Sequence, residues 1–290
     1  MTTPHEHYYV PAQSHWPIIG AIGLGSLAIG VANILHQEPI GHYFFLLGAI
    51  ILVAMMWGWF RDVIHESQAG LYSIQMDRSF RWGMVWFIFS EVMFFGAFFG
   101  ALFYAREISI PWLGGAGYKA STPLLWPTFV PTWPLLTNPD PIKFVGPTST
   151  IHAWGLPAIN TLLLLSSGAT LTWAHWGLTQ ERRKQLCFGL FLTVILGISF
   201  LICQAYEYIH AYTELGLKLS SGIYGSTFFM LTGFHGAHVT MGTIMLITIL
   251  GRSLRGDFTP KHHFAFEGVA WYWHFVDVVW LLLFVLVYWL

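Results

Sequence analysis

Hydrophobic and charged positions segregate along this chain into blocks the length of whole helices. Five runs contain no Asp, Glu, Lys or Arg: 7–37, 39–60, 144–180, 185–206 and 219–251. Each run exceeds the roughly 20 helical residues that cross the hydrocarbon core of a bilayer. Two more apolar segments contain internal acids, Glu91 in 82–105 and both Glu267 and Asp277 in 264–290. Both remain candidate spans, because acids are tolerated where they face other helices.

The pattern predicts seven transmembrane helices, since a spanning segment must satisfy its own backbone groups. We expect them near 16–36, 40–60, 82–105, 152–176, 186–212, 222–251 and 264–290. A β-barrel would need short alternating strands, whereas these runs are long and continuous. The predicted fold is therefore all-α and polytopic.

Composition and charge agree with a membrane protein. Only 9% of the 290 residues are charged and 55% are hydrophobic, whereas soluble proteins have about 25% charged residues. The net charge of −1 gives no positive electrostatic potential that would attract phosphates. No nucleic-acid partner is therefore expected.

The basic residues predict the orientation of the helices. With the N-terminus inside, the inner loops hold nine of the 13 Lys and Arg residues: Arg61, Arg78, Arg81, Arg182, Arg183, Lys184, Arg252, Arg255 and Lys261. The outer loops hold the other four, Arg106, Lys119, Lys143 and Lys218. The positive-inside rule then favours a cytoplasmic N-terminus and an external C-terminus.

The connections divide the chain into parts. We expect an N-terminal cytoplasmic tail over 1–15, a two-helix unit over 16–60, an inner loop over 61–81 and a five-helix bundle over 82–290. The bundle includes an outer-face loop at 106–150, which is rich in Pro, Trp and Gly and too broken by proline for a regular element. It packs either on its own helices or on a partner; alternatively, its tryptophans rest at headgroup depth.

Glu91 is the most informative polar residue at membrane depth. It follows Arg81 by about 15 Å of helix, which places it near the midplane. We interpret it as a neutral buried acid that hydrogen-bonds across helices; the alternative is a proton-relay acid. A relay needs a second titratable group within reach, and the sequence alone does not identify one.

Intramembrane histidines raise the possibility of a metal or heme. His235 and His238 share a face of the sixth predicted helix, and His274 and Asp277 repeat that spacing in the seventh. Imidazole suits iron, copper and zinc, but hydrogen bonds inside the bundle are the simpler interpretation. His274 and Asp277 are expected to pair with each other. Glu207 and His210, near the outer end of the fifth helix, are expected to be solvated and receive no role.

Basic and aromatic residues gather at the predicted inner face. Arg61, Asp62, His65 and Glu66 follow the second helix, and Arg252, Arg255 and Lys261 with His262 and His263 surround the loop before the seventh. Together with Trp57 and Trp59 they suit anionic lipid phosphates. The ordinary positive-inside signal accounts for the same charges without a specific lipid.

Several stretches resemble the subunit III family of cytochrome c oxidase. The longest are HHFAFE at 262–267 and WYWHFVDVVW at 271–280. Others are RDVI at 61–64, SEV at 90–92, TWAH at 172–175, YGSTFF at 224–229 and GFHG at 233–236. The resemblance covers all seven predicted spans.

The resemblance implies a non-catalytic subunit of a proton-pumping oxidase that reduces oxygen to water. In that family hemes and copper belong to partner subunits I and II, so no metal or other cofactor is expected in this chain, and cytochrome c donates electrons to the complex. His235, His238, His274 and Asp277 then have structural roles. The chain is expected to support stability, lipid binding and proton uptake by subunit I.

The resemblance also implies a two-plus-five arrangement of helices around a V-shaped cleft that holds phospholipids. Matched positions make Trp59, Glu66, Arg252, Arg255 and His262 the candidate lipid contacts. Many relatives have a Trp pair before the Arg-Asp, whereas this chain has Phe60, which leaves the headgroup contact open. Glu91 matches the family's carbodiimide-reactive acid, which is not required for pumping.

Three alternatives remain. A quinol oxidase subunit III is close, but such subunits often lack the first two helices. An independent proton-coupled transporter would use Glu91 and Asp277 and show helices broken near the midplane. A heme-binding membrane cytochrome would use the histidines. The long 106–150 segment resembles bacterial relatives, so a bacterial plasma membrane is the expected location.

Overall fold

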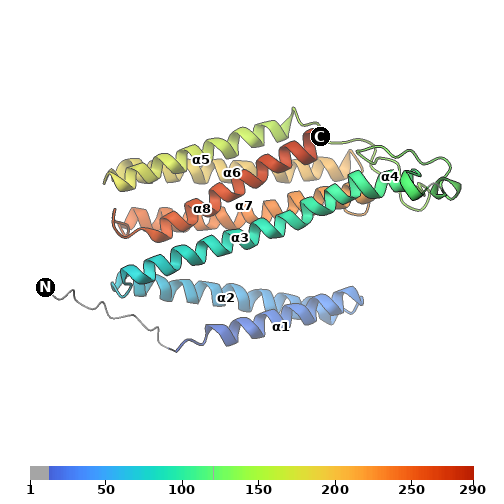
Figure 1. Ribbon diagram of the computed structural model, residues 1–290. Coiled ribbons are helices and arrows are strands. Elements are labelled where there is room, and N and C mark those ends of the chain that lie inside the picture. Colours follow the sequence, from blue (N-terminus) through green and yellow to red (C-terminus); the bar gives the residue numbers. More distant parts are fainter. Residues whose placement is uncertain (1–12, 120) are drawn as a thin grey trace. The chain divides into compact units, whose positions relative to one another are not determined.

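The computed structural model describes residues 13–119 and 121–290, and these ranges contain helices but no strand. Seven long helices are present, as the sequence predicts (Figure 1). They are α1 (Trp16–Leu35), α2 (Ile40–Gln68), α3 (Ile74–Tyr104), α5 (Leu156–Thr179), α6 (Arg183–Thr213), α7 (Ile223–Arg255) and α8 (Phe264–Leu283). The short α4 (Ile110–Leu113) follows α3, and π-helical turns extend α3 over Ala105–Ser109 and α8 over Phe284–Trp289. The predicted tail over 1–15 lies mostly outside the described residues.

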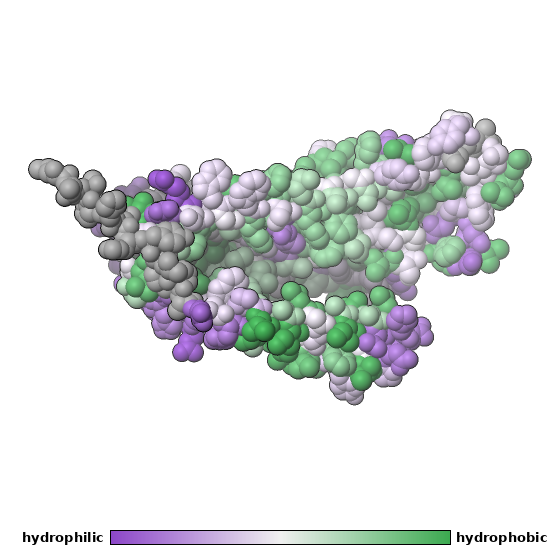
Figure 2. Space-filling view, turned by 60° about the horizontal axis from the view of Figure 1, so that its bottom comes forward, coloured by the Kyte–Doolittle hydropathy of each residue, from purple (hydrophilic) through white to green (hydrophobic). Residues whose placement is uncertain are grey.

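Six of these helices are long and apolar enough to cross a membrane; within the described residues α5 falls short of that apolarity. α5 has 24 residues, which is long enough for a bilayer, but its buried positions include Asn160 and Ser167. Hydrophobic side chains cover the length of the helices and hydrophilic ones gather near their ends (Figure 2). This distribution is that of a polytopic membrane protein.

The helix ends around the first inner connection differ from the prediction. The sequence places a loop over 61–81, whereas α2 continues to Gln68 and α3 begins at Ile74. Charged residues mark where a helix leaves hydrocarbon, and a helix can continue into the headgroup region and water. Only residues 69–73 therefore connect the two helices.

The chain divides into two compact units, Met1–Trp82 and Gly83–Leu290. In the first unit, α1 and α2 pack together through small residues. Their buried residues are Gly20, Gly23, Ser26 and Gly30 on α1 and Gly41 and Gly48 on α2. A Cβ atom on Gly48 would lie 2.6 Å from the Leu27 backbone nitrogen. The absence of side chains at such positions lets the two backbones approach closely.

In the second unit, α5 packs against α6 and α8, α6 against α7, and α7 against α8. The core between them holds large buried side chains, including Trp273, Trp280 and Phe200. The part of α3 after Trp82 joins this core through phenylalanine contacts. Phe94 lies against Phe234 of α7, with ring centroids 5.0 Å apart, and Phe95 against Phe275 of α8, at 6.1 Å. This interface uses bulky rings where the α1–α2 pair uses glycines.

The segment predicted as an irregular outer loop begins as helix. Helical turns continue from α3 to Leu113, because Pro111 lies in the first turn of α4, where proline is tolerated. The rest packs on its own bundle: Trp133 contacts Tyr224, with ring centroids 5.6 Å apart. Asn138 Nδ2 donates to the Ser221 carbonyl at 3.2 Å, and the Thr148 amide donates to the Leu215 carbonyl at 2.9 Å. Packing on its own helices is thus the alternative that the structure supports.

Candidate functional site

Glu91 has a titratable partner that the sequence did not identify. Its carboxyl oxygen Oε2 lies 2.8 Å from Nε2 of His238, on α7. The pair is surrounded by aromatic rings: Phe95 lies 5.0 Å and Tyr272 lies 6.3 Å from the imidazole, measured between centroids. The expectation of an acid that hydrogen-bonds across helices agrees with this geometry.

The second hydrogen bond of His238 determines how many protons the pair holds. Nδ1 lies 2.6 Å from the Phe234 carbonyl oxygen, which only accepts, so Nδ1 carries a hydrogen and donates it. The contact between Nε2 and Oε2 then requires one further proton. Either a protonated Glu91 donates to a neutral imidazole or an imidazolium donates to the carboxylate. The hydrogen of this contact therefore belongs to either the Glu91 carboxyl or the His238 imidazole.

Replacing Glu91 by glutamine is expected to preserve the helix contact and remove carbodiimide labelling. The glutamine amide N–H can donate to Nε2 of His238. The free energy of unfolding should therefore change by no more than about 1 kcal/mol. Labelling of the purified chain by a hydrophobic carbodiimide, followed by mass spectrometry, measures the reactive carboxyl directly. Glu66→Gln is the control and should label as the unmodified chain does. Equal labelling of Glu91→Gln and wild type would show that the reactive acid lies elsewhere.

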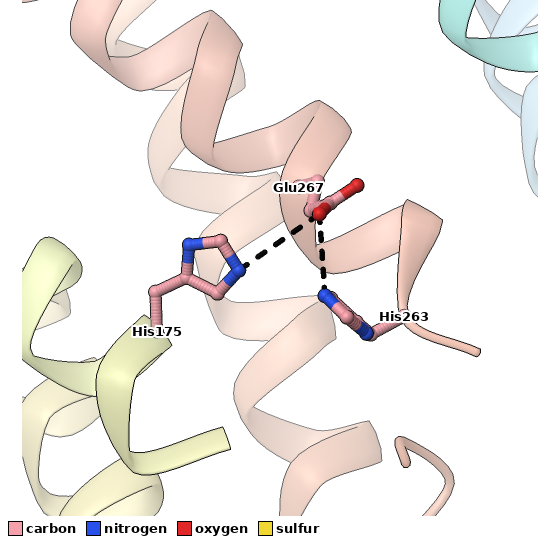
Figure 3. A group of neighbouring side chains, drawn as sticks. All are labelled: His175, His263 and Glu267. Atoms are coloured by element: carbon pink, nitrogen blue, oxygen red, sulfur yellow. Dashed lines mark ion pairs between the residues drawn. The ribbon is translucent and has the colours of Figure 1, made fainter. Parts of the chain in front are cut away.

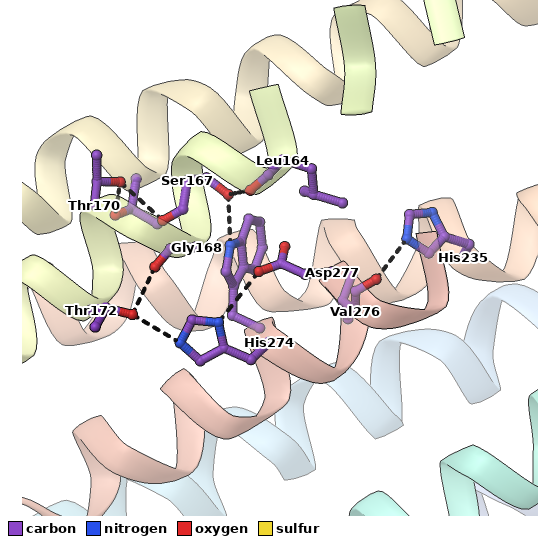
Figure 4. Close-up of polar contacts among 11 residues, drawn as sticks. Leu164, Ser167, Gly168, Thr170, Thr172, His235, His274, Val276 and Asp277 are labelled. Carbon is purple, nitrogen blue, oxygen red and sulfur yellow. Dashed lines mark hydrogen bonds and ion pairs between the residues drawn. The ribbon is translucent and has the colours of Figure 1, made fainter. Parts of the chain in front are cut away.

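The other predicted intramembrane groups make polar contacts inside the second unit (Figure 4), although Nδ1 of His235 and Oδ1 of Asp277 have no hydrogen-bond partner among the described residues. His274 Nδ1 lies 3.4 Å from Oδ2 of Asp277, which confirms the expected couple, and its Nε2 lies 3.4 Å from Thr172 Oγ1. His235 Nε2 lies 3.3 Å from the Val276 carbonyl oxygen and its side chain is fully buried. The structure does not bring these histidines to a common centre: each contacts a different group.

The candidate lipid contacts fall in both units. In the first, Trp59 is 48% exposed on α2, and Glu66 accepts a 2.7 Å hydrogen bond from Tyr72. In the second, Arg255 and His262 are exposed. Arg252 is held more tightly, since its Nε lies 3.3 Å from Asp257 and its guanidinium lies 4.6 Å from the centre of the Phe258 ring.

Glu207 differs from the expectation that it is solvated. Its side chain is 2% exposed and accepts a 2.6 Å hydrogen bond from the Tyr288 hydroxyl, at the end of the chain. The sequence places Glu207 near the end of a helix, but the chain's last turns cover that end. His210 is nearer to the expectation: it pairs with the exposed Glu214 at 3.2 Å.

A further cluster, His175, His263 and Glu267, did not emerge from the sequence as a site (Figure 3). Nε2 of His263 lies 3.2 Å and Nε2 of His175 lies 4.0 Å from Oε1 of Glu267. All three ligand atoms lie within 4.8 Å of one another. The spacing of His263 and Glu267, four residues apart, was a visible signal; the approach of His175 required the fold. Among the described residues this is the one group with the geometry to hold a metal ion.

Comparisons with known proteins cover nearly the whole chain. Residues 5–290 match the family model described as cytochrome c oxidase subunit III. A cytochrome c oxidase subunit 3 from Drosophila melanogaster is 42% identical over 291 aligned positions, covering 100% of this chain and 99% of that protein. Proteins of the same name from Marchantia polymorpha and Dugong dugon are each 40% identical, over 100% of this chain and 98% and 99% of their own lengths.

Proposed function

The chain belongs to the cytochrome c oxidase subunit III family, and from this premise we propose that it is a non-catalytic subunit of a proton-pumping oxidase. It supports the stability and proton uptake of the oxygen-reducing subunit I, binds phospholipids, and carries no redox metal. Its partners are subunits I and II, which hold the hemes and copper, and cytochrome c is the electron donor to the complex.

The pairing of the intramembrane histidines carries this proposal. Both ring nitrogens of His238 and of His274 contact polar groups of the second unit, and His235 contacts the Val276 carbonyl. Imidazoles held by such contacts stabilise the packing of the helices. Nδ1 of His235 has no hydrogen-bond partner among the described residues, but the other ring nitrogens of these three histidines are held by groups of this unit. The arrangement therefore favours a scaffold over a membrane cytochrome.

Lipid binding is supported by exposed groups at the helix ends. Arg255 and His262 are exposed and suit a phosphate headgroup, and Trp59 suits the interfacial depth next to it. Arg252 contributes charge from a fixed position, because Asp257 and Phe258 hold its guanidinium. Glu66, which accepts a hydrogen bond from Tyr72, would contact a headgroup by accepting a hydrogen bond from an N–H or O–H donor of the lipid.

We further propose that the chain is a multi-pass protein of a bacterial plasma membrane, with its N-terminus on the cytoplasmic side. The basic residues of the inner connections support the orientation. The length of the 106–150 segment does not support the bacterial assignment, because the fly, liverwort and dugong proteins align with this chain over 98–99% of their own lengths.

The transporter alternative predicted helices that break near the midplane. α3 and α8, which carry Glu91 and Asp277, are continuous over Ile74–Tyr104 and Phe264–Leu283. A midplane substrate site built from broken helices therefore has no counterpart in these two helices. The structure does not favour the quinol oxidase alternative. Quinol oxidase subunits often lack the first two helices, whereas α1 and α2 are both present here.

Removing this chain from the purified oxidase should leave an enzyme that starts normally and then inactivates during turnover. The catalytic metals remain in subunits I and II, so the initial rate is preserved, whereas the support for subunit I is lost. Oxygen consumption followed over many turnovers measures both phases. The intact complex, handled in the same detergent, is the control. Undiminished activity of the depleted enzyme throughout would contradict the proposed role.

A further inference from the structure

We propose that His175, His263 and Glu267 form a binding site for a Zn²⁺ ion at one end of the α5–α8 bundle, with a water molecule in the fourth position. Two histidines, one carboxylate and a water are a recognised zinc ligand set. The site is separate from the histidines considered as heme ligands, and the inference does not depend on the oxidase role proposed above. It replaces the expectation that no metal binds this chain.

The ends of two helices bring the three side chains together. His263 is the N-cap residue of α8 and Glu267 lies in its first turn, so the two share a helix face. His175 lies one turn before the end of α5 at Thr179. Figure 3 shows its imidazole directed at the carboxylate from the neighbouring helix.

The hydrogen bonding of His263 leaves its Nε2 in position to bind a metal ion beside Glu267. Its Nδ1 lies 3.0 Å from the Thr259 carbonyl oxygen, so Nδ1 donates a hydrogen and Nε2 faces Glu267. A lone pair and a carboxylate oxygen 3.2 Å apart repel unless a proton or a metal ion lies between them. Donation of the other ring N–H to a backbone carbonyl is also the usual way that metal-binding histidines are oriented.

His175 provides an independent indication. Its Nε2 is buried from solvent and has no hydrogen-bond partner among the described residues, which is unfavourable for a polar atom. The nearest oxygen, Oε1 of Glu267, is 4.0 Å away, beyond a hydrogen bond. An ion between the two atoms would give Nε2 of His175 a partner.

The distances suit zinc after a small adjustment. Ligands at 2.0–2.2 Å from a tetrahedral ion lie about 3.3–3.6 Å apart. The contact between His263 and Glu267 is already close to this length, and the three ligand atoms lie within 4.8 Å. Zinc coordination by all three residues requires the His175 ring, which rests against Phe266 with centroids 5.2 Å apart, to move closer to Glu267. Calcium and magnesium are disfavoured, because they prefer oxygen ligands.

Zinc binding to the purified full-length chain in detergent tests the site. After metal removal and titration with ZnCl₂, we expect one tightly held ion per chain. The midpoint temperature of thermal unfolding should rise, and a chelator should reverse that rise. His175→Ala and Glu267→Gln should each bind at least about tenfold more weakly. His152→Ala removes an exposed histidine away from the site and should bind as wild type does. No retained zinc in wild type, or equal affinity in all four proteins, would overturn the proposal.

His175→Cys keeps the test decisive if the other variants fail to fold. A thiolate ligand introduces a zinc–sulfur distance of about 2.3 Å, which X-ray absorption distinguishes from nitrogen and oxygen. We expect two imidazoles in the zinc shell of wild type, and one imidazole plus one sulfur in this variant. A wild-type shell without imidazole, or a variant shell without sulfur, would place the ion elsewhere.

Discussion

Replacing Trp273 by alanine is expected to destabilise the second unit by about 3–5 kcal/mol, the usual cost of truncating a buried tryptophan. The side chain is fully buried, and its indole Nε1 donates a 2.8 Å hydrogen bond to Ser167 of α5. Its ring fills space left by two glycines: a Cβ on Gly197 of α6 or on Gly242 of α7 would lie 2.9 Å or 2.8 Å from it. One side chain of α8 thus contacts three other helices.

The chain's own cysteines provide the measurement for Trp273→Ala. Cys187 and Cys203 are free and partly buried in α6, so a thiol-reactive dye reports thermal unfolding in detergent. Trp176→Ala is the control, because that tryptophan is 58% exposed and should cost less than about 0.5 kcal/mol. Ser167→Ala removes only the hydrogen-bond partner and should cost about 1–2 kcal/mol. Equal midpoint temperatures of unfolding for Trp273→Ala and Trp176→Ala would contradict the role assigned to the buried ring.

Replacing Gly48 by leucine is expected to separate α1 from α2 in the first unit. The new Cβ would lie 2.6 Å from the Leu27 nitrogen and 2.8 Å from the Gly23 carbonyl oxygen, and backbone atoms cannot move aside as a flexible side chain can. Overpacking of this kind costs about 1–3 kcal/mol or more. Hydrophobic burial does not compensate, since lipid is as apolar as the helix surface.

The separation can be measured by distances between spin labels at the exposed positions Leu24 and Leu46, with Cys187 and Cys203 replaced by serine. We expect a longer and broader distance distribution in Gly48→Leu. Gly25→Leu is the matched control, because nothing lies within 4 Å of a Cβ at that position of α1. Identical distributions in the two variants would show that close backbone approach does not hold the pair.

The fold was largely predictable because hydrocarbon excludes charge. The five charge-free runs and the two apolar segments with internal acids locate all seven long helices. They understate α2, which continues through Arg61 and Asp62 to Gln68. These residues lie on the extension of the helix beyond the apolar run, where charge is tolerated and backbone hydrogen bonds persist. The position of charged residues along the sequence shows where the chain leaves the hydrocarbon. It predicts the end of a helix only where the helix ends at that same point.

The polar contacts were predictable only where they are local. His274 and Asp277 lie one turn apart, so helical spacing alone places them together. The partner of Glu91 is His238, 147 positions later, and its selection depends on the rotation of α3 and α7 about their axes. His175 required the same information, although both it and Glu267 lie in stretches that carry the family resemblance. Tyr288 of the final turns buries Glu207 in a way that no local pattern indicates.

The glycine-lined contact of α1 and α2 reverses the usual relation between residue size and tolerance to substitution. In a soluble core, exchanging a large apolar residue is harmful and exchanging an exposed small one is harmless. Here the buried positions of both helices are glycine or serine, and leucines such as Leu24 and Leu46 face outward. A mutational scan of this hairpin should therefore find its least replaceable positions among its smallest residues, while isoleucine, valine and phenylalanine exchange freely at the bulky ones.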